Sequence, residues 1–290
     1  MILSFPAIIC SLFICQYLPE SVSNQREEKI MEKVISKDGT TISFSKKGNG
    51  PPLLFVHGVT ADHNSWNALL PRLEHHFTVY AMDRRGRGES GDAPQYELKR
   101  EAEDIVAVVE HLNEPVHLFG HSYGGLCCME AVLLTDKIRK LVLYEPAIHV
   151  ADSIYTADAA EEIRKRIEAD DLESAMEYFL RDIAKMTEHE LEMYRKMPLW
   201  NARIPLVLTI PREMEAEQMY RFSKQRFSNM KTQTLLLTGG DSPDFAHEAA
   251  ELIHSSLPNS EVIVLEGEQH VAHHTNPDLL TRKLLEFLIE

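Results

Sequence analysis

Short apolar runs recur along most of this chain and are separated by longer amphipathic segments. Continuous apolar runs of strand length lie at 52–56, 77–82, 116–119, 141–144, 234–238 and 261–265. Such runs are typical of strands that are buried on both faces of a sheet. Apolar residues recur at helical spacing at 64–74, 96–112 and 245–257. Strands that alternate with helices predict an α/β fold, in which helices cover both faces of a mostly parallel sheet.

The beginning of this pattern predicts a β-hairpin. Residues 33–36 and 41–45 read as two short strands, and Asp38-Gly39 between them is a dipeptide typical of hairpin turns. With the hairpin included, we expect about eight strands, of which the first two are antiparallel and the later ones alternate with helices.

The segment at 147–231 interrupts the alternation of strands and helices. It is rich in charged residues, and its apolar residues recur on one helical face, as at Leu172, Met176, Phe179 and Ile183. This segment is much longer than the single helix that usually joins two parallel strands. We therefore predict a helical cap at 147–231 over the strand ends, and an α/β core made of residues 31–146 and 232–290.

The first 30 residues have two interpretations. Residues 1–18 are largely apolar, and Ser21-Val22-Ser23 offers small residues for cleavage, as in a signal peptide. However, no Lys or Arg precedes the apolar run, and Pro6 interrupts it. The run is also short for a membrane span, so we expect no stable span. Residues 1–30 are either a signal peptide, which implies a secreted or periplasmic protein, or a non-native extension of a cytoplasmic one.

Composition narrows the classes of function. The chain has 290 residues, 44% of them hydrophobic, which is enough for one large core. Its formal net charge of −15 argues against binding to nucleic acid. Cys127 and Cys128 are adjacent within a predicted helix and are interpreted as small core residues. The cysteines lack zinc-type spacing and no glycine-rich phosphate loop is present, so we expect no metal, no cofactor and a small-molecule substrate.

The strongest motif is Gly120-His121-Ser122-Tyr123-Gly124, a G-x-S-x-G sequence. It lies between the apolar run at 116–119 and a predicted helix at 126–134, the context of a nucleophile elbow. The sharp turn holds the serine in a strained conformation and exposes its hydroxyl. We expect that a Cβ at either glycine would collide with a neighbouring strand or helix, and that His121 packs beneath the turn.

A serine hydroxyl needs a base within hydrogen-bonding distance and a carboxylate that orients this base. Ser122, Asp241 and His270 each follow a predicted strand, and the carboxyl ends of parallel strands meet at one edge of a sheet. His273 and His274 are rival bases, although they lack the strand and the Gly-x-x-His context of His270.

Together these motifs resemble the α/β-hydrolase superfamily, over residues 31–290. The matching segments are His57-Gly58, the run from Asp83 to Ser90, the run from Gly120 to Gly125, Asp241, and the run from Gly267 to His270. The resemblance implies an α/β-hydrolase fold with the catalytic order serine, acid, histidine. It also implies that the backbone amides of Val59 and Tyr123 form the oxyanion hole.

The resemblance leaves the acid open. In the family, the acid often lies in a Gly-x-x-Asp loop, and Asp241 comes one residue early for that pattern. Glu145 ends the strand that follows the elbow helix, a position from which some members, such as haloalkane dehalogenases, take their acid. Asp241 is the favoured prediction, Glu145 is the alternative, and Asp244 lies further from the strand end.

A serine at the elbow implies acyl transfer to water and argues against the dehalogenase and epoxide-hydrolase branches, which use aspartate there. The resemblance thus predicts a serine hydrolase that cleaves a small carboxylic ester through a Ser-His-Asp triad. Hydrolysis of a carbon–carbon bond and perhydrolase chemistry are alternatives on the same triad. A ligand receptor with vestigial turnover is the alternative outside enzymes.

Overall fold

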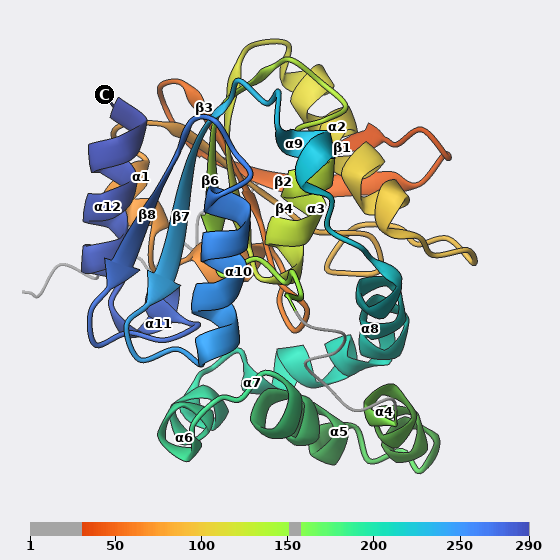
Figure 1. Cartoon of the computed structure of the whole chain (residues 1–290). Helices are drawn as coiled ribbons and strands as arrows, with labels where there is room; N and C mark the ends of the chain where they lie inside the picture. Colours follow the sequence, from red (N-terminus) through yellow and green to blue (C-terminus); the bar gives the residue numbers. More distant parts are fainter. Residues whose placement is uncertain (1–30, 151–157, 290) are drawn as a thin grey trace, which may run out of the picture.

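The computed structural model describes residues 31–150 and 158–289. The interpretations of residues 1–30 lie outside these ranges. Eight strands form one sheet in the order β1-β2-β4-β3-β5-β6-β7-β8 (Figure 1). The strands are β1 (Met31–Ile35), β2 (Thr41–Gly48), β3 (Pro52–Val56), β4 (Thr78–Met82), β5 (Val116–His121), β6 (Ile138–Tyr144), β7 (Gln233–Gly239) and β8 (Ser260–Leu265).

Strand direction follows the predicted pattern. β1 and β2 form an antiparallel hairpin, and β2 is also antiparallel to β4. From β4 to β8 every neighbouring pair is parallel. The central strands are buried on both faces, as at β3 and β4, where every residue is buried. The predicted α/β-hydrolase fold is therefore confirmed.

Helices cover both faces of the sheet. One face carries α2 (Leu98–Leu112), α3 (Tyr123–Ala131) and α10 (Asp244–His254), and the other carries α1 (Leu70–Leu73) and α12 (Pro277–Ile289). The single helix predicted at 64–74 is wrong: a 3-10 turn, η1 (His63–Trp66), precedes the short α1. Pro71 explains the break, because proline fits the first turn of a helix and disrupts a helix interior.

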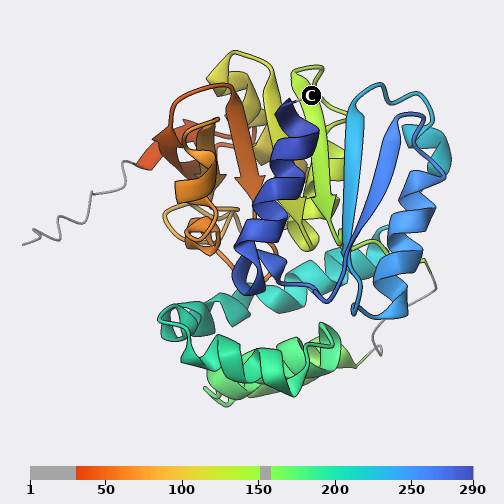
Figure 2. The same ribbon diagram turned by 90° about the vertical axis from the view of Figure 1, so that its left-hand side faces the viewer.

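The chain between β6 and β7 forms a helical insertion, which we define as α4 to α9. Its elements are α4 (Ala159–Glu168), α5 (Leu172–Tyr178), the π-helix η2 (Phe179–Ile183), α6 (Glu188–Lys196), α7 (Trp200–Arg203), the 3-10 helix η3 (Ile204–Thr209), α8 (Ile210–Met219) and α9 (Lys224–Phe227). Figures 1 and 2 show that α4 to α8 lie across the end of the sheet toward which the arrowheads of β7 and β8 point. Side chains at the carboxyl ends of the strands therefore face the insertion.

Within the described ranges, no helix has the length and apolar character of a membrane span.

Candidate active site

Ser122 lies at a sharp turn between β5 and α3. Its backbone has φ 53° and ψ −125°, a conformation that L-residues rarely adopt. Four backbone hydrogen bonds hold this turn: the Ser122 amide donates to the carbonyl of Tyr144, and its carbonyl accepts from the amides of Gly125, Leu126 and Ala147. The surrounding structure thus compensates for the strain at Ser122, as is common at functional sites.

Two glycines make the turn possible, as the sequence predicts. A Cβ at Gly120 would lie 2.7 Å from the Cα of Gly125 in α3. A Cβ at Gly124 would lie 2.5 Å from the carbonyl oxygen of Val56 at the end of β3. Only glycine permits the strand and the helix to approach the turn this closely.

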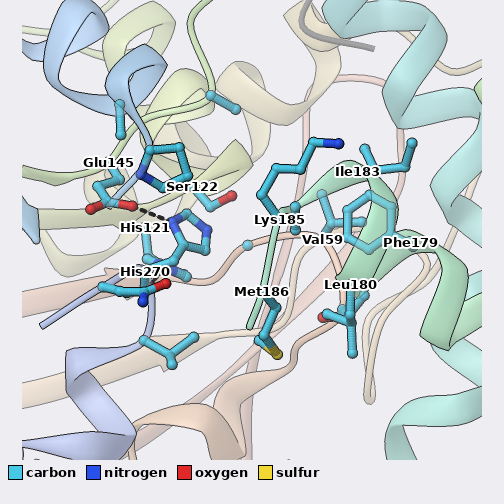
Figure 3. Close-up of a pocket in the computed structure, with 18 of the residues that line it drawn as sticks. Val59, His121, Ser122, Glu145, Phe179, Leu180, Ile183, Lys185, Met186 and His270 are labelled. Atoms are coloured by element: carbon cyan, nitrogen blue, oxygen red, sulfur yellow. Dashed lines mark hydrogen bonds and ion pairs between the residues drawn. The ribbon is translucent and has the colours of Figure 1, made fainter. Parts of the chain in front are cut away.

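The imidazole of His270 contacts a carboxylate, and that carboxylate belongs to Glu145. His270 Nδ1 lies 2.6 Å from Glu145 Oε2 (dashed line in Figure 3). The prediction that Asp241 lies against His270 is therefore wrong. Asp241 is exposed, and its amide donates to the carbonyl of Glu268. Asp244 is also exposed, at the first residue of α10.

The side chain of Glu145 also extends to the end of β7. Its Oε1 accepts hydrogen bonds from the amide of Gly239 at 2.7 Å and from the hydroxyl of Ser242 at 2.5 Å. Burial alone would raise the pKa of the Glu145 carboxyl, but the hydrogen bonds from His270, Gly239 and Ser242 outweigh burial and lower this pKa below its usual value. Glu145 is therefore an ionised acceptor at neutral pH.

The loop that carries His270 is attached to the neighbouring strands. His121 Nε2 lies 2.8 Å from the carbonyl oxygen of His270, to which it donates. The hydroxyl of Tyr144 donates to the carbonyl of Gln269 and accepts from the amide of Ala272. Sequence analysis missed Tyr144, although its position at the end of the strand before Glu145 was a signal that could have identified it.

We expect Tyr144→Phe to weaken both stability and turnover. The substitution removes the hydrogen bond to the half-buried Gln269 carbonyl and leaves the buried Ala272 amide without this partner, which costs about 1–3 kcal/mol of unfolding free energy. Turnover should fall because the loop positions His270. Urea unfolding and ester kinetics would measure the two effects, with Tyr178→Phe in the insertion as the control. Wild-type stability of Tyr144→Phe would contradict the role given to this hydroxyl.

Two backbone amides beside Ser122 are free to bind an oxyanion. In the described part of the chain, the N–H groups of Val59 and Tyr123 donate to no backbone or side-chain acceptor. The loop that follows β3 lies directly against the serine. This is shown by Gly58, where an added Cβ would lie 3.1 Å from the Ser122 Cβ. Val59 follows Gly58, and Tyr123 begins α3, so each amide lies beside the serine.

A cavity of about 120 Å³ opens in front of Ser122, His270 and Glu145. Its lining is mainly apolar, and residues of the insertion face the serine across it (Figure 3). These residues include Phe179, Leu180, Ile183 and Met186. The first three belong to the π-helix η2, and π-helical turns occur often at functional sites.

Of the other histidines near the site, His121 and His273 are buried and His274 is half-buried. Burial lowers the pKa of His121 and of His273 well below the usual value. Burial, followed by the charge of Arg203, lowers the pKa of His274 to about 3. Only the ring of His270 contacts a carboxylate among these histidines, which favours His270 over His273 and His274 as the base.

Histidines that stay neutral in the folded protein destabilise it in acid. Unfolded His274 takes up a proton below pH 6.5, whereas the folded protein takes up this proton only near pH 3. Unfolding free energy therefore falls as pH falls through this window. We expect His274→Gln to reduce the slope of unfolding free energy between pH 5 and 6 by roughly 1 kcal/mol per pH unit. Urea titrations would measure this slope, and the exposed His76→Gln variant should retain the wild-type slope.

Within residues 31–150 and 158–289, no group of three or more His, Cys, Asp or Glu residues has an arrangement that could hold a metal ion.

The fold and the site agree with similarities to known proteins. Residues 53–282 match the sequence profile of the alpha/beta hydrolase family. The chain is 26% identical to a Haemophilus influenzae protein whose name describes it as an esterase/lipase. The alignment spans 254 residues and covers 83% of this chain and 84% of that protein. The chain is 25% identical over 260 residues to the 2-(acetamidomethylene)succinate hydrolase of Mesorhizobium japonicum, covering 86% and 91%.

A solved structure is similar over nearly the whole chain. The crystal structure of an alpha/beta hydrolase from Sphaerobacter thermophilus matches with a TM-score of 0.79 and 29% sequence identity, covering 89% of this chain and 100% of that one. Because the family profile spans most of the sequence, the chain belongs to the alpha/beta hydrolase family. The relatives from Haemophilus influenzae and Mesorhizobium japonicum carry names of hydrolases, and the protein is a hydrolase enzyme.

Proposed function

We propose that the protein is a serine hydrolase that cleaves small carboxylic esters through a triad of Ser122, His270 and Glu145. The observation that carries the proposal is that the ends of β5, β6 and β8 bring these residues to one cavity, with the Glu145 carboxylate 2.6 Å from the His270 ring. Glu145 replaces Asp241 in the role of the acid. The amides of Val59 and Tyr123 form the oxyanion hole.

The geometry supports acyl transfer in two steps. Ser122 Oγ attacks the ester carbonyl while His270 Nε2 takes the hydroxyl proton, and the oxyanion accepts hydrogen bonds from the two amides. His270 then gives this proton to the departing alkoxide, which leaves an acyl-enzyme. A water attacks the acyl-enzyme with His270 as the base and releases the acid. Throughout, Glu145 accepts from the Nδ1–H and stabilises the charged imidazolium.

No hydrogen bond between Ser122 Oγ and His270 Nε2 is present among the described residues. Such catalytic hydrogen bonds are often long in hydrolases without substrate and tighten when substrate binds. The apolar side chains of η2 and Met186 support an apolar acyl group in the cavity.

The test is multiple turnover on p-nitrophenyl esters of increasing acyl length, together with an enamide and a carbon–carbon substrate. We expect the short esters to be hydrolysed and a fluorophosphonate probe to label the wild type. Preferred cleavage of the carbon–carbon substrate would overturn the ester assignment. Binding of an ester analogue with no turnover would support a receptor and contradict the enzyme mechanism.

A further inference from the structure

Four buried charged side chains lie behind the loop that carries Val59. Arg84 and Arg87 follow β4, Glu101 lies in α2, and Glu213 lies in α8 of the insertion. All four are at most 1% exposed. The cluster balances two positive charges with two negative ones, so that its buried charges are compensated.

Glu213 connects the two arginines. Its Oε1 accepts from Arg84 Nη2 at 2.6 Å and from Arg87 Nη2 at 2.9 Å. Its Oε2 accepts from Arg87 Nη2 at 2.9 Å. Arg84 also donates to both carboxylate oxygens of Glu101, at 2.7 Å and 3.1 Å. Glu213 is therefore the partner that Arg84 and Arg87 share, and it comes from the insertion.

Arg84 and His57 hold the peptide that joins Gly58 to Val59. Arg84 Nη1 donates to the Gly58 carbonyl at 3.2 Å, and His57 Nδ1 donates to it at 2.8 Å. Because a trans peptide is planar, its C=O and N–H point in opposite directions. Holding the Gly58 carbonyl toward the arginines therefore directs the Val59 N–H away from them.

The next peptide and the side chain of Tyr123 contact the same cluster. Arg87 donates to the Val59 carbonyl through Nη2 at 2.8 Å and Nε at 3.1 Å. The guanidinium of Arg84 lies 4.6 Å from the ring centre of Tyr123. The Tyr123 hydroxyl also contacts the hydroxyl of Tyr96 at 2.9 Å. Both residues of the proposed oxyanion hole thus contact the arginines that Glu213 connects.

We propose that Glu213 is a positioning residue through which helix α8 of the insertion sets the geometry of the oxyanion hole. It acts through Arg84 and Arg87 and does not line the cavity. The inference rests on the proposed function, because it concerns the amides of Val59 and Tyr123. Without Glu213, two buried guanidinium groups would share one carboxylate, and their repulsion would displace the loop they hold.

The main test compares Glu213→Gln with Glu215→Gln on the same helix. Glu215 is half-exposed and pairs with Arg164, away from the oxyanion loop. We expect Glu213→Gln to lower kcat for a p-nitrophenyl ester by about 10²-fold, the effect of losing one oxyanion donor, with KM nearly unchanged. Glu215→Gln should retain the wild-type kcat. Rates are compared below the melting temperature of each variant.

A second measurement separates positioning from general destabilisation. A trifluoromethyl ketone forms a tetrahedral oxyanion on the serine, whereas the methyl ketone of the same chain length binds as a ground-state analogue. We expect Glu213→Gln to weaken binding of the trifluoromethyl ketone by about 10²-fold and to leave binding of the methyl ketone unchanged. Equal weakening of both ketones would overturn the proposal.

The double variant Arg87→Met/Glu213→Gln provides the test if the single variant fails to fold. It removes one charge of each sign, so the remaining pair of Arg84 and Glu101 stays compensated, while the hydrogen bonds to the Val59 carbonyl are lost. We expect a folded protein with kcat reduced by at least 10²-fold. A folded double variant with kcat within threefold of wild type overturns the proposal. Turnover that survives Ser122→Ala would instead overturn the proposed function.

Discussion

Ser122→Ala is expected to lower kcat for a p-nitrophenyl ester by about 10⁶-fold, the loss seen when the serine of a comparable triad is removed. Alanine cannot form the acyl-enzyme, and the remaining rate would come from water activated near the oxyanion hole. Stability should change little, because the Ser122 side chain is only partly buried and the turn is held through its backbone.

Initial-rate kinetics with the purified variant would measure this effect, and labelling by a fluorophosphonate probe should disappear in parallel. Ser228→Ala, at an exposed serine outside the cavity, is the matched control and should behave as the wild type. Undiminished labelling of Ser122→Ala would assign the nucleophile to another residue and would remove the basis of the proposed mechanism.

Glu145→Gln is expected to lower kcat by about 10⁴-fold, as the loss of a triad carboxylate does when the geometry is kept. The carboxylate of Glu145 accepts the Nδ1–H of His270 and thereby leaves Nε2 free to take the serine proton. The amide of glutamine can donate to Nδ1, which favours the tautomer with its proton on Nε2. That tautomer cannot act as the base.

Asp241→Asn is the matched control, because it makes the same change of charge at the carboxylate that sequence analysis favoured. We expect it to keep kcat within about twofold of the wild type, since Asp241 is exposed and does not line the cavity. A large loss in Asp241→Asn together with a small loss in Glu145→Gln would restore Asp241 as the acid. Melting temperatures of both variants show whether either loss reflects unfolding.

The contribution of Glu145 to the unfolding free energy is expected to decrease in acid. Its pKa in the folded protein lies below the usual value, so the unfolded chain takes up the proton first as the pH falls. Its contribution to stability is therefore present above the unfolded pKa and is lost as the pH falls through the folded pKa. The unfolding free energy of Glu145→Gln should therefore decrease less than that of the wild type as the pH falls.

The local pattern of apolar and polar residues was sufficient to predict a sheet covered by layers of helices. Buried parallel strands must be apolar on both faces, and crossover helices must be amphipathic, so the alternation of the two identifies the sheet before any tertiary contact is known. The same reasoning predicted the turn at Ser122, because only glycine at 120 and 124 allows β3 and α3 to approach it. His270 followed from its position after the last strand.

Tertiary structure decided which carboxylate reaches the histidine. Asp241 and Glu145 both follow strands, and those strands, β7 and β6, are neighbours in the sheet. Which of the two carboxylates contacts His270 depends on the direction of one side chain at a strand end. The spacing of apolar residues along the sequence does not predict this direction. Glu145 reaches across the end of β7, accepts from the Gly239 amide and takes the position beside His270.

The sequence by itself therefore determined the sheet, its helical layers, and Ser122 and His270 as the candidate nucleophile and base, because these depend on short-range pattern and turn chemistry. Only the tertiary structure placed Glu145 at the His270 ring and Glu213 between Arg84 and Arg87. Glu213 is more than 120 residues from either arginine in the chain. Contacts between residues so far apart in the sequence depend on how the insertion packs on the sheet. The sequence around each residue does not predict them.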